Sequence, residues 1–166
     1  VLAMAAAVTA PAQAQVQRIF LNPSFETPTL PNGCYRLIPS DNVPGWETTH
    51  PAGATSGTCT MSGLLTTGGL IEMWSTGFSS VNARDGRNFV ELNANQASRL
   101  YQRICLVNGE TVGWQFSHRG RSSATTRDVA EVKIGASTSV AQVGTTSDGS
   151  INTPVAYLGT INTPPS

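Results

Sequence analysis

The chain has 166 residues, and its ten basic and ten acidic side chains leave no net charge. This length favours one domain with a hydrophobic core of its own. The charge balance offers no basic surplus for nucleic acid or an anionic membrane surface, so neither partner is expected. Charged residues make up only 12%, and Lys and Glu, which favour helices, are scarce. The composition is typical of an all-β secreted domain.

Residues 1–14 are expected to be part of a signal peptide. The run VLAMAAAVTAPAQAQ is uncharged and apolar, and Ala12-Gln13-Ala14 fits a cleavage site after Ala14. The positively charged start of a signal is missing, so the chain is expected to begin inside it, with the domain over residues 15–166. A secreted or cell-surface location follows. The run is too short to span a membrane, and the alternative is a buried helix of the fold.

The three cysteines predict one disulfide. Cys34 and Cys59 flank a segment rich in Pro and Gly within residues 28–63, which as a whole indicate a long loop. In an exported protein, a disulfide between these two cysteines would make such a loop credible. Cys105 is then either a buried free thiol or paired beyond Ser166. No Cys or His spacing typical of a metal site is present.

Alternating and apolar patterns predict short strands along the chain, separated by turn signals such as Asp85-Gly86. No segment has a convincing helical period. Many short strands of this kind are typical of a sandwich or jelly roll. The expected strands cover residues 16–28 (a short strand into a turn), 68–78, 88–94, 98–107, 111–118 and 128–136, with weaker ones at 138–144 and 154–161 and a turn or linker at 161–166.

The strand period places His118 at the end of a core-facing row. Val112, Trp114, Phe116 and His118 share one face of the strand at residues 111–118. Ser117 lies on the opposite face and no nucleophile elbow is present, so a catalytic triad is not expected.

Several motifs occur in an order that resembles secreted galactose-binding-like jelly-roll domains, as in plant cell-wall proteins of unknown function and bacterial surface proteins. The resemblance covers about residues 19–135. The motifs are LNPSFETP, VPGW, IEMWSTGF, DGRNFVELNANQAS, LYQRICL and GETVGWQFSHRGR.

The resemblance implies a two-sheet antiparallel jelly-roll sandwich that binds glycans or mediates adhesion outside the cell and is not an enzyme. It also implies a structural calcium ion near the first strand, with Glu26 as a ligand; the alternative for Glu26 is a turn-capping role. The final-strand Asp of the family has no match, so the jelly roll is expected to be truncated at its C-terminal end.

Aromatic and arginine side chains are the candidates for a glycan site. A flat aromatic ring stacks on the apolar face of a sugar, and a guanidinium donates to hydroxyl, carboxylate or sulfate groups. For each aromatic residue the alternative is packing in the core or at its rim, and for the arginines it is an ion pair with Asp128 or Glu131. The candidates are Trp46, Trp74, Tyr101, Arg119 and Arg121.

Two mid-strand carboxylates raise the alternative of glycoside hydrolysis. Glu72 and Glu91 could act as acid and base if their carboxyl groups were held about 5–10 Å apart, but no local spacing enforces that distance. Cross-strand pairing with arginine is favoured instead. The candidate partners are Arg84, Arg87 and Arg103.

The sequence therefore predicts a secreted, non-catalytic carbohydrate-binding or adhesion module. The alternatives are a structural surface or matrix protein that binds protein partners and an accessory domain of a larger glycan-active enzyme. The sequence predicts neither the sugar nor an oligomeric state.

Overall fold

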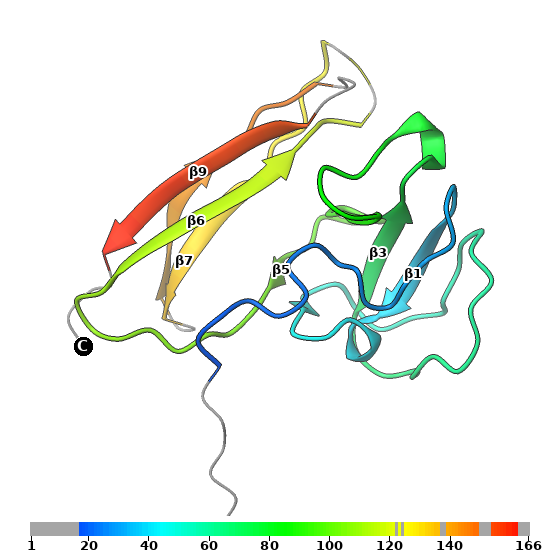
Figure 1. Ribbon diagram of the computed structural model, residues 1–166, viewed down its shortest axis with the longest axis horizontal. Helices are drawn as coiled ribbons and strands as arrows, with labels where there is room; N and C mark the ends of the chain where they lie inside the picture. Colours follow the sequence, from blue (N-terminus) through cyan, green and yellow to red (C-terminus); the bar gives the residue numbers. More distant parts are fainter. Residues whose placement is uncertain (1–16, 122, 124, 137–138, 150–153, 163–166) are drawn as a thin grey trace, which may run out of the picture.

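The computed structural model describes residues 17–121, 123, 125–136, 139–149 and 154–162. Its described part is mostly β-structure in several small antiparallel sheets, without α-helices and without a closed barrel. No helix among these residues has the length and hydropathy needed to cross a bilayer. Figure 1 shows β1 and β3 in one region of the molecule and β6, β7 and β9 in another. We refer to residues 17–101 as the first strand group and to residues 111–162 as the second.

The first strand group is built on a three-stranded sheet of order β1-β3-β4, and a short ladder joins β2 to β5. Two short 3-10 turns, η1 and η2, follow β1 and β3. The elements are β1 (Tyr35–Pro39), η1 (Ser40–Asn42), β2 (Glu47–Thr48), β3 (Leu70–Ser75), η2 (Phe78–Ser80), β4 (Asn88–Glu91) and β5 (Leu100–Tyr101).

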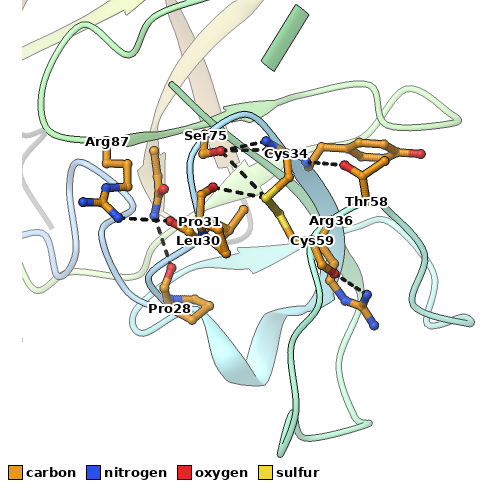
Figure 2. The surroundings of a disulfide bond; sticks show 11 residues. Pro28, Leu30, Pro31, Cys34, Arg36, Thr58, Cys59, Ser75 and Arg87 are labelled. Carbon is orange, nitrogen blue, oxygen red and sulfur yellow. Dashed lines mark hydrogen bonds between the residues drawn. A yellow bond between two sulfur atoms is a disulfide. The ribbon is translucent and has the colours of Figure 1, made fainter. Parts of the chain in front are cut away.

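One face of this sheet packs on a core that contains a disulfide. Ile38 of β1 and Met73 of β3 are completely buried together with Leu30. The predicted bridge between Cys34 and Cys59 lies in the same cluster, and Figure 2 shows Leu30 and Ser75 beside it. Burial of these side chains, together with the cross-link, stabilises the first strand group.

The second strand group consists of two antiparallel pairs, β6 with β9 and β7 with β8. The β6–β9 ladder is continuous from Thr111 opposite Asn162 to His118 opposite Val155. The elements are β6 (Thr111–His118), β7 (Glu131–Ala136), β8 (Ser139–Thr145) and β9 (Val155–Asn162).

Trp114 packs the two pairs against each other. A Cβ at Gly144 of β8 would lie 3.1 Å from its ring, and one at Gly159 of β9 would lie 2.4 Å from it. Phe116 stacks on Trp114 and on Tyr157, at centroid distances of 5.9 Å and 5.4 Å. Exposure alternates along β6, so the predicted shared face of Val112, Trp114, Phe116 and His118 is confirmed.

Three predictions about secondary structure are only partly correct. The short strand expected at the start of residues 16–28 does not form among residues 17–21, whereas the turn expected after it is present, with Asn22 and Phe25 at φ values of 48° and 58°. Residues 28–63 are not only loop, since they contain β1, η1 and β2; the apolar pair Leu37 and Ile38 pairs with β3 and is buried.

The strand predicted at residues 98–107 is reduced to β5, because the chain leaves the ladder after Tyr101. Further along, the Cys105 N–H donates to the Gln17 carbonyl instead of to a neighbouring strand. The Cys105 thiol is free and exposed, which excludes a buried free thiol. The signal peptide predicted at residues 1–14 lies outside the described residues, as do residues 163–166 of the predicted turn or linker.

The Cys34–Cys59 disulfide is expected to stabilise the folded protein. Replacing both Cys34 and Cys59 by Ser is expected to lower the free energy of unfolding by about 3 kcal/mol, because the bridge closes a loop with a sequence separation of 25 residues. Urea unfolding followed by circular dichroism measures the change. Cys105→Ser is the control and is expected to leave the free energy within about 0.5 kcal/mol of the wild type. An equal loss in the control, or none in the double variant, would contradict the prediction.

Candidate functional site

A cleft with a volume of about 1540 Å³ lies between the two strand groups. One wall comes from β4 and the segments that flank it, and the other comes from the end of β6, the loop after it, β7 and β9. The side chains that carry the chemistry of this cleft are Trp74, Glu91, His118, Arg119, Arg121 and Tyr157.

Arg121 connects the two walls. Register places Glu72 of β3 directly opposite Glu91 of β4, and Trp74 is two residues further along the same face of β3. The Trp74 indole N–H donates to Glu72 Oε1 at 2.8 Å. Arg121 Nη1 donates to Glu91 Oε1 at 2.6 Å, and its guanidinium lies 5.1 Å from the centroid of the Trp74 ring. The carboxylate and the ring therefore fix the guanidinium at the cleft.

Glu91 has an unusual electrostatic environment. Burial raises its pKa, and the negative charge of Glu72 raises it further. Arg121 lowers it through its charge and its hydrogen bond, while Asp128 adds a smaller upward effect, so that the pKa lies above the ordinary value of 4.5. Glu91 Oε2 is buried and has no hydrogen-bond partner among the described residues. The negative charge of Glu91 is therefore balanced only in part.

His118 ends β6 in a network with a buried aspartate. Its Nδ1 is 2.7 Å from Oδ2 of Asp148, which is 5% exposed. The Tyr157 hydroxyl lies 2.8 Å and 2.7 Å from the two oxygens of the same carboxylate, and this hydrogen bond raises the pKa of Tyr157. Ser117 is exposed on the other face of β6, so it is not placed as a nucleophile beside His118.

The loop after β6 is shaped by close backbone contacts. The Gly120 N–H donates to the Gly149 carbonyl at 3.0 Å, and a Cβ at position 120 would lie 2.1 Å from the Asp148 carbonyl oxygen. Only glycine fits such an approach. The Arg121 backbone N–H donates to Asp128 Oδ2 at 2.6 Å. These contacts hold Arg119 and Arg121 at the edge of the cleft.

Trp46 lies outside the lining of the cleft. Its indole N–H donates to the Asn22 carbonyl at 2.9 Å. Its ring stacks on Phe25 at 4.6 Å and on Phe20 at 6.1 Å between centroids. These contacts correspond to packing at the rim of the core.

Tyr101 also lies apart from the cleft. Its hydroxyl donates to Glu47 Oε2 at 3.0 Å, and the Arg103 guanidinium lies 5.7 Å from the centroid of its ring. Of the five predicted ligand-binding residues, the cleft therefore brings together Trp74, Arg119 and Arg121.

Glu26 connects the first turn of the described chain to β4. Its Oε1 accepts hydrogen bonds from the backbone N–H groups of Arg87 at 2.8 Å and Asn88 at 2.9 Å. The Asn88 side-chain amide donates in turn to the carbonyls of Phe25 and Pro28. These contacts match the turn-capping alternative for Glu26.

A calcium ion takes six to eight oxygen ligands, and Oε1 of Glu26 is already engaged by two backbone N–H groups. Among the described residues, no three or more His, Cys, Asp or Glu side chains converge on a position that could hold a metal ion. The residues present therefore do not form a recognisable calcium cage, and structural calcium stays a prediction.

Sequence reasoning missed the partners in the cleft. Glu91 pairs with Arg121, and Glu72 accepts from Trp74, in place of the expected partners Arg84, Arg87 and Arg103. Strand alternation does put Glu72 and Trp74 on one face. Arg121 could not be identified as the partner of Glu91 from nearby residues. The register of β3 on β4 and the approach of the loop after β6 both depend on parts of the chain that are far apart in sequence.

The environment of Glu91 predicts a pH dependence. The pKa of the Glu91 carboxyl is higher in the folded protein than in the unfolded chain. Its contribution to the free energy of unfolding is therefore fully present below the unfolded-state pKa, and it is lost as the pH rises through the folded-state pKa. The stability of the wild type relative to Glu91→Gln is therefore expected to be lower at neutral pH than below the ordinary carboxyl pKa of 4.5. Urea unfolding across this range measures the difference, with Glu131→Gln on the exposed face of β7 as the control. A constant difference, or one of opposite slope, would contradict the assignment.

The contacts of Glu26 predict that Glu26→Ala destabilises the protein by about 1–3 kcal/mol, because two backbone N–H groups lose their acceptor. Glu26→Gln keeps an acceptor oxygen and is expected to lose less. Thermal unfolding of the wild type and both variants measures these losses. Repeating it with millimolar calcium tests whether the protein binds the ion at Glu26. A melting temperature of the wild type that does not respond to calcium would count against Glu26 as a calcium ligand.

Comparison of the chain with protein-family models, with curated proteins and with solved structures finds no match in any of the three.

Proposed function

We propose that this protein is a secreted or cell-surface, non-catalytic module that binds a glycan in the cleft between its strand groups. The Cys34–Cys59 bridge supports the location, since disulfides persist in oxidising compartments. We also propose for the domain the galactose-binding-like jelly roll that the motifs resemble, supported by its antiparallel strand pairs.

The fixed position of Arg121 at an open cleft is the observation that carries this proposal. A side chain already held by Glu91 and Trp74 loses little conformational freedom when a ligand binds. Its side chain still has 62% of its surface exposed. A guanidinium has five N–H donors, so donors remain for a ligand beyond the bond to Glu91.

The surface of the cleft combines apolar and polar groups, as a sugar does. Leu92, Val129 and Leu158 are exposed there with 38%, 62% and 77% of their surface accessible. Gln115 and Ser117 of β6 add amide and hydroxyl groups. Pockets for single small molecules measure about 300–1,000 Å³, and this cleft is larger. It therefore suits several linked sugar rings better than one.

The carboxylate pair supports binding rather than hydrolysis. Glycosidases place their two carboxyl groups on opposite sides of the bond that is cleaved. Glu72 and Glu91 instead lie side by side on one sheet face. Glu72 is buried and engaged by Trp74, and Glu91 is engaged by Arg121. Neither carboxyl group is therefore arranged to act on a sugar in the cleft.

A protein partner is the second candidate. The same exposed apolar side chains, Leu158 above all, would also be buried by a protein surface.

A glycan array, followed by titration of the best ligand, tests the proposal. We expect the wild type to bind at least one glycan, and Arg121→Ala to weaken binding by about tenfold or more through loss of its charge-assisted hydrogen bonds. Arg103→Ala removes an exposed arginine outside the cleft and is expected to bind like the wild type. Circular dichroism confirms that each variant is folded. Binding to no glycan, together with self-association or capture of a protein partner, would favour the second candidate.

A further inference from the structure

Two further arginines of the cleft have donors without a partner. Arg84 lies in the segment between η2 and β4, and Arg99 immediately precedes β5; both line the cleft and are exposed. Within the described part of the chain, neither guanidinium forms a hydrogen bond or an ion pair. Each therefore presents its full set of N–H donors to the solvent of the cleft.

The carboxylates that line the cleft already have partners within the protein. Asp85 accepts from the Ser24 hydroxyl at 2.5 Å, and Glu91 accepts from Arg121. Asp128 accepts from the Arg121 backbone N–H, and Glu131 forms an ion pair with Lys133 at 2.5 Å.

Among the described charged groups that line the cleft, the guanidinium groups of Arg84 and Arg99 thus stand out because they have no partner within the protein. A guanidinium presents a planar fork of N–H groups that matches two oxygens of a carboxylate or sulfate, whereas a sugar hydroxyl fills only one of its positions. Arginine makes up nine of the ten basic residues of the chain.

We infer that the cleft binds an acidic glycan, a chain that carries carboxylate or sulfate groups, with Arg84 and Arg99 as residues that bind its anionic groups. This inference rests on the proposed function and assigns the class of its ligand. Arg84 and Arg99 lie on the wall formed by the first strand group, and Arg121 reaches the cleft from the second. A glycan that crosses the cleft meets guanidinium groups from both walls.

The charge of the whole chain restricts how this recognition works. Because the chain has no net charge, long-range attraction of polyanions is weak, and selection depends on short-range contacts with the forked donors. Other polyanions that lack a matching shape are therefore expected to bind poorly.

Isothermal titration with glycans of equal chain length tests the inference. The probes are oligomannuronate, which carries carboxylates, a sulfated heparin oligosaccharide, and neutral manno-oligosaccharide. We expect at least one acidic probe to bind about tenfold or more tightly than the neutral one, with the preference decreasing between about 50 mM and about 300 mM salt as the charges are screened. Tight binding of oligomannuronate would show that carboxylates suffice, whereas tight binding of heparin alone would assign sulfate, because heparin carries both groups.

Substitutions of the cleft arginines separate the effect of their positive charge from the effect of their forked N–H geometry. Arg84→Gln and Arg99→Gln are each expected to weaken binding of the acidic probe by about fivefold to tenfold and to leave the neutral probe unchanged. Arg84→Lys keeps the charge but loses the fork, and an intermediate loss is expected. Arg103→Gln, outside the cleft, is the matched control. Since neither Arg84 nor Arg99 has a side-chain partner in the described protein, the substitutions are not expected to disturb folding.

The experiments distinguish failure of this inference from failure of the proposed glycan-binding function. Equal affinity for neutral and acidic probes, unaffected by Arg84→Gln and Arg99→Gln, would overturn the assignment of an acidic ligand and leave the glycan-binding function in place. Binding to none of these probes, nor to any glycan of an array, would overturn the proposed function and the inference together. Equally tight binding to duplex DNA would show that charge alone is responsible and would also overturn the inference.

Discussion

The disulfide between Cys34 and Cys59 organises the first strand group, on which one wall of the cleft depends. The residues before Cys59 run beside β1, where the N–H groups of Thr58 and Cys59 both donate to the Tyr35 carbonyl. Arg36 Nη1 donates to the Cys59 carbonyl at 2.7 Å, as Figure 2 shows. The cross-link and these bonds tie an irregular segment to the sheet edge, so that a small apolar cluster can close around them.

The sheet that rests on this core has two faces with different roles. Because side chains alternate along a strand, Ile71 and Met73 enter the core while Glu72 and Trp74 project to the other side. That second face is also largely covered, since both residues are buried. The burial of polar Glu72 is tolerated because the indole N–H of Trp74 satisfies one of its oxygens.

Arg121 allows two groups of strands without a shared ladder to form one site. No described strand of one group pairs with a strand of the other, so side chains across the cleft carry part of the connection. The loop that carries Arg121 is positioned by the contact of Gly120 with the Asp148 backbone and by the contact of its own N–H with Asp128. The network of His118, Asp148 and Tyr157 stabilises the end of β6 from which this loop departs. Its histidine is thus a positioning residue.

The amino-acid sequence by itself determined the mostly β character, the Cys34–Cys59 bridge, the strands of the second group and the inward row from Val112 to His118. These follow from composition, from the position of two cysteines on either side of one loop-forming segment and from a period of two along each strand, all of which are visible in the sequence itself. It did not predict that residues 17–21 form no strand before the expected turn, that β1 forms inside an expected loop, or that the chain leaves its ladder after Tyr101. Those outcomes depend on where backbone hydrogen-bond partners lie in space. Only the tertiary structure decided that Glu72 faces Glu91, that Arg121 crosses to them, and that Arg84 and Arg99 share their cleft, because strand register and the approach of distant loops are set by packing over the whole chain.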